Sequence, residues 1–297
     1  MSSTLVLMSA TDHPAVDAAL AGRVRTAVGA DEIRWLSRGV ACDMRLPLNS
    51  AAPDEAEAAA REAIAGRPVD IAILPEATRR KALLIADMDS TIIGQECIDE
   101  LADLVGLKSH IAAITERAMR GEIAFEPALR ERVALLGGID LDQIRRVLEE
   151  RITLTAGART LVATMRSTGA YTALVSGGFT LFTEAIARRV GFDENRANEL
   201  LLDGDRLSGL VREPILGRDA KREALAELVA KLGIDAQAAI AVGDGANDLA
   251  MLEAAGLGVA FHAKPAVAKA ADVRIDHSDL TALLFLQGYS DSEIIAG

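Results

Sequence analysis

Cysteine and histidine are scarce in this sequence of 297 residues. The two cysteines, Cys42 and Cys97, show neither a CxxC spacing nor a histidine cluster beside them. Zinc sites and disulfide frameworks depend on such groupings, so we expect two free thiols in a reducing compartment. The histidines also lack a metal-ligand spacing, and they number four: His13, His110, His262 and His277.

Long apolar runs and an excess of positive charge are absent as well. No stretch approaches the roughly 18 uninterrupted apolar residues of a membrane span. The N-terminus, MSSTLVLMSATDH, lacks the basic segment and long apolar core of a signal peptide. Lys and Arg total 32 against 44 Asp and Glu, a formal net charge of −12 that argues against broad nucleic-acid binding. We therefore expect a cytoplasmic protein that binds neither membrane nor nucleic acid, and the sequence leaves open whether it forms a homodimer.

Hydrophobic residues make up 50% of the chain, enough for one large domain and a smaller one. Residues 1–78 read as the smaller unit. We expect strand, helix, two extended segments, helix and strand, in that order, at residues 4–10, 13–29, 32–48, 54–65 and 69–76. This β-α-β-β-α-β order predicts a small α+β domain of the ferredoxin-like type. The polar residues 76–81 are the expected linker.

Residues 79–297 predict an α/β domain with a Rossmann-like parallel sheet. Strands separated by helices are expected at 83–86, 172–175, 238–243, 257–261 and 273–275, a pattern typical of a parallel sheet covered on both faces. Between the first two strands, residues 97 to about 152 carry only helical spacing, so we expect a helical cap inserted between core segments 79–96 and 153–297. The turn DGD within residues 201–211 indicates a hairpin.

Polar motifs follow three of the expected strands. Asp87 and Asp89 stand directly after an apolar strand, and like charges at that spacing repel unless a cation holds them. SGG (176–178) and GDGAND (243–248) follow two further strands. Ligands bind at the carboxyl ends of the strands in an open parallel sheet, so we expect one composite site there.

Together the motifs DMDST (87–91), SGGFT (176–180), the lysine of DAKRE (219–223) and GDGANDLAM (243–251) resemble those of the haloacid dehalogenase-like phosphatases, in the same order. The resemblance covers roughly residues 82–290. It is closest to the members that hydrolyse phosphoserine, because Glu96 and the segment FEPALRERV (125–133) match their substrate-binding segments. The N-terminal unit resembles an ACT-like domain.

This resemblance implies a covalent mechanism. Asp87 would attack the phosphorus and form an aspartyl-phosphate. Asp89 would protonate the leaving oxygen and then activate the hydrolytic water. The implied cofactor is Mg²⁺, which favours oxygen ligands, held by Asp87, the main-chain carbonyl of Asp89 and Asp244, with Asp248 in a supporting role.

The transferred phosphoryl group needs hydrogen-bond donors and a cation. Ser176 offers a hydroxyl, and Gly177 and Gly178 let backbone N–H groups approach closely. Lys221 is the candidate cation that neutralises the phosphoryl charge. An ordinary solvated helix lysine is the alternative reading of Lys221, and its neighbour Arg222 could be mistaken for it.

Substrate recognition depends on a second set of residues. A phosphorylated amino acid carries an ammonium group that Glu96 can pair with and a carboxylate that Arg132 can bind with its fork of N–H groups. Asn247 and the backbone at Gly177 could add hydrogen bonds. Met119 and Phe125 are expected to form an apolar lid that excludes water, although residues of these types are more often part of a core.

The expected reaction is the hydrolysis of O-phospho-L-serine to L-serine and phosphate, the last step of serine biosynthesis. The nearest alternative is action on another small phosphomonoester, or transfer of the phosphoryl group to an acceptor such as homoserine. An alternative of another class is a regulatory protein whose N-terminal unit senses a free amino acid. A fragment of a membrane pump is disfavoured by Asp89 and by the lack of apolar spans.

Overall fold

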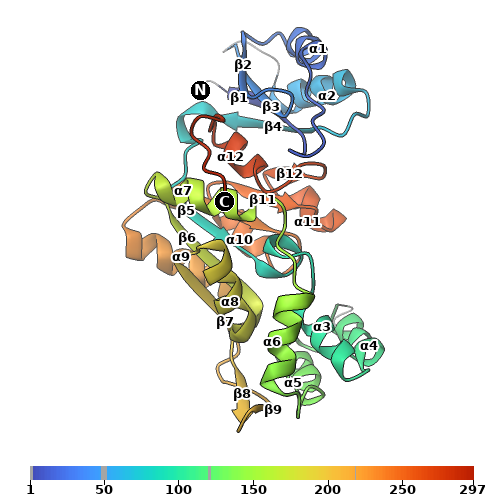
Figure 1. The fold of residues 1–297 in the computed structure, drawn as a ribbon. Coiled ribbons are helices and arrows are strands. Elements are labelled where there is room, and N and C mark those ends of the chain that lie inside the picture. Colours follow the sequence, from blue (N-terminus) through green and yellow to red (C-terminus); the bar gives the residue numbers. More distant parts are fainter. Residues whose placement is uncertain (1–2, 48–51, 120–121, 218) are drawn as a thin grey trace.

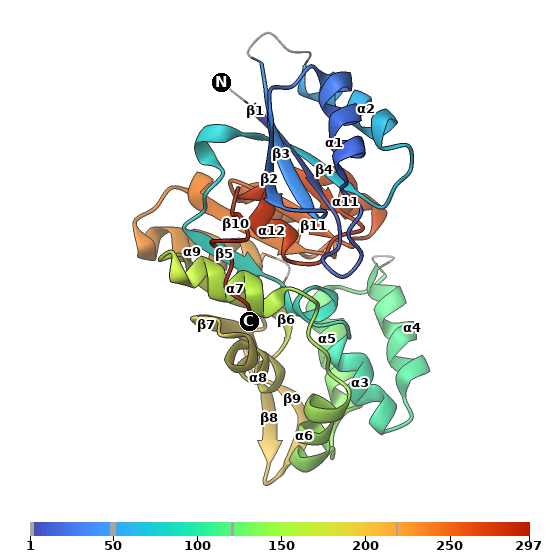
Figure 2. The same cartoon turned by 45° about the horizontal axis from the view of Figure 1, so that its top comes forward.

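A computed structural model describes residues 3–47, 52–119, 122–217 and 219–297 of the chain. Its parts form three tiers: an N-terminal unit, a central sheet covered by helices, and a helical cap (Figure 1). A second view, turned by 45°, shows the cap helices and the β8–β9 hairpin together on the side of the central sheet opposite the N-terminal unit (Figure 2). Within the described ranges, no helix is long and apolar enough to cross a membrane.

The N-terminal unit has the predicted β-α-β-β-α-β order. Its elements are β1 (Ser3–Met8), α1 (Ala18–Val28), β2 (Ile33–Ser37), β3 (Ala41–Leu46), α2 (Pro53–Ile64) and β4 (Asp70–Pro75). The strands form an antiparallel sheet in the order β2-β3-β1-β4. Helix α1 begins later than predicted, because Val16 bridges to Gly39 in an extended conformation and Asp17 then caps the helix by accepting a hydrogen bond from the Leu20 N–H at 2.7 Å.

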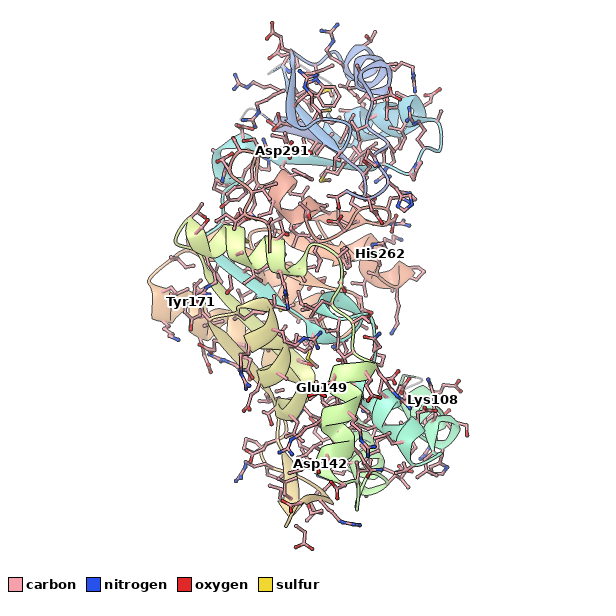
Figure 3. All side chains as sticks on the ribbon, viewed as in Figure 1. Lys108, Asp142, Glu149, Tyr171, His262 and Asp291 are labelled. Atoms are coloured by element: carbon pink, nitrogen blue, oxygen red, sulfur yellow. The ribbon has the colours of Figure 1, made fainter. Side chains whose placement is uncertain are left out.

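Both faces of the N-terminal sheet are buried. Leu5 and Leu7 of β1 pack with α1 and α2, whereas Val6 and Met8 join the hydrophobic core of the central domain. Helix α12 (Ala282–Leu286) lies against that second face, and every one of its residues is buried. The C-terminal tail continues beside the sheet, where the Asp291 N–H donates to the Leu36 carbonyl at 2.8 Å (Figure 3).

A buried ion pair ties the N-terminal sheet to α12. The Arg79 guanidinium donates from Nη1 to Asp43 of β3 at 2.7 Å and from Nε to the Leu286 carbonyl at 2.9 Å. Arg34 donates to the same carboxylate from the solvent side, with its Nε 2.8 Å from Oδ1. Polar contacts therefore lock the interface that the apolar face of the sheet creates.

The central sheet is parallel, with the strand order β12-β11-β10-β5-β6-β7. Its strands are β5 (Leu83–Ala86), β6 (Tyr171–Phe179), β7 (Glu194–Asn198), β10 (Ala239–Gly243), β11 (Gly258–Phe261) and β12 (Val273–Ile275). Helices α7 (Ala158–Ser167), α8 (Thr180–Val190) and α12 cover one face, and α9 (Ala220–Leu232), α10 (Leu249–Ala254) and α11 (Pro265–Ala270) cover the other. This is the predicted Rossmann-like arrangement, with the motif segments at the carboxyl ends of β5, β6 and β10.

The cap consists of the predicted helices together with the hairpin. The helices are α3 (Cys97–Leu104), α4 (Lys108–Met119), α5 (Phe125–Ala134) and α6 (Leu141–Glu150). The hairpin, β8 (Leu200–Asp203) and β9 (Arg206–Val211), follows β7 in sequence but packs against α5. Its Leu207 exchanges backbone hydrogen bonds with Gly138 and Ile139 at 2.8 and 2.9 Å. The hairpin therefore belongs to the cap in space.

Candidate active site

The first functional segment is a tight turn that follows β5. The Asp87 N–H donates to the Val242 carbonyl of β10 at 3.0 Å, which fixes the position of the turn on the sheet. One carboxylate oxygen of Asp87, Oδ1, accepts the Met88 N–H at 2.7 Å. Ser90 adopts a left-handed conformation with φ 55°, which is uncommon for a residue with a side chain and is often found at functional sites.

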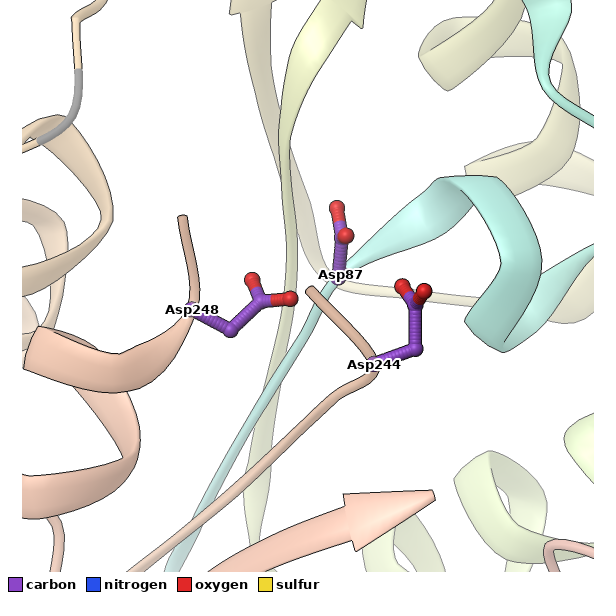
Figure 4. A group of neighbouring side chains, drawn as sticks. All are labelled: Asp87, Asp244 and Asp248. Atoms are coloured by element: carbon purple, nitrogen blue, oxygen red, sulfur yellow. The ribbon is translucent and has the colours of Figure 1, made fainter. Parts of the chain in front are cut away.

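Three buried carboxylates converge at this point. One oxygen from each of Asp87, Asp244 and Asp248 lies within 4.8 Å of the others. Figure 4 shows Asp87 arriving from the end of β5 and the other two from the segment after β10. The two strands are neighbours in the sheet, so their carboxyl ends bring together residues that are more than 150 positions apart in sequence.

Lys221 at the start of α9 is the buried cation of the cluster. Its Nζ lies 2.6 Å from Oδ1 of Asp87 and 2.6 Å from Oδ1 of Asp248. The alternative of a solvated helix lysine is wrong for this residue, which is 4% exposed, whereas neighbouring Arg222 is exposed. Burial alone would lower the pKa of Lys221, but the charges of Asp248 and Asp87 and their hydrogen bonds raise it above its ordinary value. Lys221 therefore stays protonated.

The charge of the cluster fits a divalent cation. Burial raises the pKa of Asp87 well above its ordinary value and that of Asp244 to about 6, and the charge of Asp248 adds to both shifts. Lys221 opposes these shifts but supplies only one positive charge to the three carboxylates. A hard divalent cation with oxygen ligands would balance the remainder, so the residues present suit such an ion.

Asp248 has both carboxylate oxygens engaged by protein donors. Oδ1 accepts from Lys221, and Oδ2 accepts the Gly245 N–H at 3.0 Å. Gly243 makes room for this side chain, because a Cβ at that position would lie 2.3 Å from the Asp248 Cγ. Asp248 therefore orients Lys221 and the loop after β10, which is compatible with the supporting role expected for it.

Asp89 lies in a different electrostatic environment. Burial raises its pKa to about 7, the charge of Glu96 adds to the shift, and hydrogen bonds from Cys97 oppose it. Its Oδ1 atom is buried and has no hydrogen-bond partner among the described residues. A carboxyl group with such a pKa is partly protonated near neutral pH, which is the property that a general acid requires.

The SGG segment lies opposite Asp89, on β6. This strand continues to Phe179, four residues beyond its predicted end, with an irregular register between Val175 and Phe179. Ser176 is buried and its Oγ accepts the Gly178 N–H at 2.9 Å. A Cβ at Gly178 would lie 3.3 Å from the Asp89 Oδ2, so the glycine allows a close approach of the two segments. The sequence places Gly178 in the motif but does not show that this glycine lies against Asp89.

The predicted substrate-binding residues come from the cap and from the loop after β10. Glu96 is exposed at the start of α3, and its Oε1 accepts the Ser90 hydroxyl at 2.7 Å. Arg132 is half-buried on α5, and Asn247 is exposed after β10. Phe125 lies over the SGG segment, since a Cβ at Gly177 would be 3.8 Å from its Cζ. The side chain of Met119 lies outside the described residues.

Comparisons with known proteins identify the family of the chain. The haloacid dehalogenase-like hydrolase family matches residues 84–253. A curated relative from Albidiferax ferrireducens, named phosphoserine phosphatase, is 49% identical over 209 residues, which cover 69% of this chain and 88% of the relative.

Two solved structures are similar in fold. A haloacid dehalogenase family hydrolase from Salmonella enterica serovar Typhi has a TM-score of 0.86 and 29% identity, covering 98% of this chain and 99% of that one. A structure described as a phospho-aspartyl intermediate analogue of phosphoserine phosphatase has a TM-score of 0.64 and 37% identity, covering 69% of this chain and 98% of that one. The motifs, the fold and the family match lead to one conclusion: the chain belongs to the haloacid dehalogenase-like hydrolases.

Proposed function

We propose that the chain hydrolyses O-phospho-L-serine to L-serine and phosphate, the last step of serine biosynthesis. One observation carries this proposal: the Asp87 carboxylate is buried 2.6 Å from the Lys221 ammonium, beside Asp244 and Asp248. A carboxylate positioned beside cations at the end of a parallel strand is suited to attack phosphorus. The names of the similar proteins support phosphoserine as the substrate.

In the first step, Asp87 is the nucleophile. The Met88 N–H and the Lys221 ammonium both reach its Oδ1, which leaves Oδ2 to attack the phosphorus. The bond between phosphorus and the serine oxygen breaks, and Asp89 donates its proton to that oxygen. L-serine leaves, and the phosphoryl group stays on Asp87 as an aspartyl-phosphate.

In the second step, Asp89 acts as a base. The carboxylate formed in the first step takes a proton from a water molecule, whose oxygen attacks the phosphorus. The bond between phosphorus and Asp87 breaks, phosphate leaves, and Asp87 and protonated Asp89 are restored. Ser176, the backbone at Gly177 and Lys221 bind the phosphoryl oxygens in both steps.

The proposed cofactor is Mg²⁺. Asp87, the main-chain carbonyl of Asp89 and Asp244 would hold it, with Asp248 supporting the site. When bound, the ion neutralises negative charge on the phosphoryl group and polarises it. Because the carboxylates come from two neighbouring strand ends, the fold itself supports this ligand set.

The amino-acid part of the substrate is assigned to the cap side of the site. Glu96 pairs with the ammonium group and Arg132 with the carboxylate, while Asn247 adds a hydrogen bond. Phe125 and Met119 form the apolar part of the lid. The position of Phe125 over the SGG segment supports this assignment.

The division of the chain into an ACT-like unit of residues 1–78 and a phosphatase domain of residues 79–297 is part of the proposal. Cytoplasmic residence is another part. The two cysteines are free and buried, as expected for a protein of a reducing compartment.

A substrate panel tests the proposed function. Phosphate release would be measured with O-phospho-L-serine, phosphoglycolate, a sugar phosphate and O-phosphohomoserine, each with and without homoserine as acceptor. We expect phosphoserine to have the highest kcat/KM, and Asp87→Asn to abolish turnover. A higher kcat/KM for phosphoglycolate or a sugar phosphate would refute the substrate assignment, and full turnover by the amide variant without deamidation would refute the mechanism.

A further inference from the structure

Arg132 is a half-buried cation on α5. Within the described ranges, no carboxylate lies at ion-pair distance from its guanidinium, although Asp99 and Glu96 act on it electrostatically from farther away. Burial lowers the pKa of Arg132, and these two acids oppose the shift. A guanidinium in such surroundings stays charged and gains from an anionic ligand.

The position of Arg132 on α5 directs it toward the site. It follows Phe125 by seven residues, two helical turns, and residues at this spacing lie on the same face of a helix. Phe125 is the residue of α5 that approaches Gly177. Arg132 therefore lies farther along the same face of α5, where the charge of Glu96 reaches it.

Two protein acceptors hold the Arg132 side chain. Its Nε donates to the Ala128 carbonyl of the same helix at 3.2 Å, and its Nη1 donates to the Thr115 hydroxyl of α4 at 3.3 Å. The Thr115 hydroxyl in turn donates to the Ile111 carbonyl at 3.1 Å. Because its own proton is engaged there, the hydroxyl can meet Arg132 only as an acceptor.

The hydrogen bond from the Thr115 hydroxyl to the Ile111 carbonyl is common for a threonine within a helix. The hydrogen bond that the same hydroxyl accepts from Arg132 is not a usual feature of a helix. Threonine often donates to the carbonyl four residues earlier, and this needs no partner on another helix. The additional contact joins α4 to α5 through a charged donor. Among the described residues, the hydrogens of Nη2 and one hydrogen of Nη1 have no protein acceptor, and hydrogens on the two Nη groups can bind a carboxylate.

We propose that Thr115 is a positioning residue for substrate specificity: its hydroxyl fixes the rotation of the Arg132 guanidinium so that the outer edge of the fork receives the carboxylate of the substrate. This inference rests on the proposed function. It assigns to α4 a part in recognition that does not involve contact with the substrate. Thr115 acts through Arg132 alone, so its effect depends on the presence of a carboxylate in the substrate.

The test compares two substrates that differ by that carboxylate, O-phospho-L-serine and O-phosphoethanolamine. Thr115→Val removes the acceptor and keeps the shape of the side chain, whereas Thr115→Ser keeps the hydroxyl. We expect Thr115→Val to raise KM for phosphoserine about 5- to 10-fold, with kcat within about 2-fold and KM for phosphoethanolamine unchanged. Thr115→Ser should restore KM for phosphoserine to within about 2-fold of the parent value.

A double-mutant cycle separates this inference from the proposed function. In an Arg132→Ala background, Thr115→Val should change KM for phosphoserine no further, because the group that it positions is gone. If Arg132→Ala lowers the preference for phosphoserine and Thr115→Val does not, the positioning role is wrong and the proposed function stands. If Arg132→Ala leaves the preference unchanged, both the carboxylate assignment and the positioning role are wrong.

Equal changes in KM for both substrates would also contradict the inference, since they would indicate a general disturbance of the cap. Thermal unfolding of each variant identifies such a disturbance. Should Thr115→Val be poorly folded, Thr115→Ala and Thr115→Ser provide the same comparison with smaller side chains. Loss of phosphoserine preference in the alanine variant and its recovery in the serine variant would support the role of the hydroxyl.

Discussion

The Lys221 ammonium lies 2.6 Å from the Asp87 carboxylate, and their side chains are only 5% and 6% exposed. Asp248 binds the same ammonium at an equal distance and is fully buried. One cation is therefore shared by the expected nucleophile and by a second carboxylate that holds it in place. Removing this cation would leave two buried negative charges facing each other.

Lys221→Met should accordingly lower kcat about 10²- to 10³-fold, because a preorganised positive charge is lost from the phosphoryl site. Initial rates of phosphate release measure the effect. Arg222→Met is the matched control, since this neighbouring cation is exposed, and it should retain kcat within about 2-fold. Comparable losses in both variants would show that α9 as a whole, not the buried ammonium, supports activity.

Mg²⁺ should stabilise the folded chain measurably. A ligand that binds only the native state at 100 times its Kd adds about 2.7 kcal/mol to the free energy of unfolding. Asp244→Asn removes one of the three clustered carboxylates and should shift the Mg²⁺ dependence of Tm to higher concentrations. Asp203→Asn, in the exposed hairpin, serves as the control. An unchanged Mg²⁺ dependence in the Asp244 variant would argue against the proposed ligand set.

Asp89→Asn should separate the two chemical steps. With phosphoserine, kcat should fall about 10²- to 10⁴-fold, because the leaving oxygen receives no proton. With p-nitrophenyl phosphate, whose leaving group needs no proton, the first step should survive and the aspartyl-phosphate should accumulate. A burst of p-nitrophenolate without steady turnover is the expected signal. Steady release at the parent rate would contradict the role of Asp89 in the second step.

The pH dependence of kcat should follow the protonation of Asp89. The pKa of Asp89 is raised above its ordinary value to about 7, first by burial and then by the charge of Glu96. The protonated form is therefore present below about pH 7 and lost above it, so kcat for phosphoserine should decline on the alkaline side. This decline should be absent in Asp89→Asn. A parent profile that stays flat through this range would show that proton donation does not limit turnover.

Asp43 should govern the acid stability of the interface between the N-terminal unit and the central domain. Burial favours a higher pKa for Asp43, but hydrogen bonds from Arg34 and Arg79 lower it overall, below its ordinary value of 3.8. Its contribution to stability is thus present above that value and is lost as pH falls through the folded pKa. Asp43→Asn should lower the free energy of unfolding by about 3 kcal/mol, because the buried Arg79 would lose its nearer acidic partner and keep Glu76, at 3.3 Å, as the more distant one.

Urea unfolding at neutral pH measures this loss. Glu57→Gln breaks an exposed ion pair with Arg61 on α2 and is the control, with an expected change below about 1 kcal/mol. Similar changes in the free energy of unfolding of both variants would show that the buried ion pair contributes no more to stability than the exposed one.

Hydrophobic periodicity and the motifs predicted most of the fold. The strands of the central sheet are apolar, and three of them end in the motif segments. The edge strand β7 was not predicted. Its sequence, Glu194–Asn198, is polar, and it pairs with β6 at the border of the sheet, where apolar patterning is weak. The later start of α1 was missed because helical spacing continues through His13 and Pro14, although tertiary pairing holds that segment extended.

The expected site residues from the motif segments lie together, but their mutual contacts could not be predicted. The resemblance of the motifs identified Lys221 and Asp248 separately, and the order of the strands in the sheet brings the ammonium between two carboxylates. The contact of Thr115 with Arg132 was equally hidden, because it depends on how two cap helices pack. Sequence thus identifies the chemical groups, whereas distances depend on long-range packing.

The N-terminal sheet buries apolar side chains on both sides, and this links its presence to the C-terminal helix α12. Helix α12 reads ALLFL and meets that sheet with side chains that are all buried. A chain without the N-terminal unit would expose to water the part of α12 that contacts β1, and exposed apolar patches favour aggregation. The N-terminal unit and α12, some 200 residues apart in sequence, therefore depend on each other to keep this apolar surface out of water.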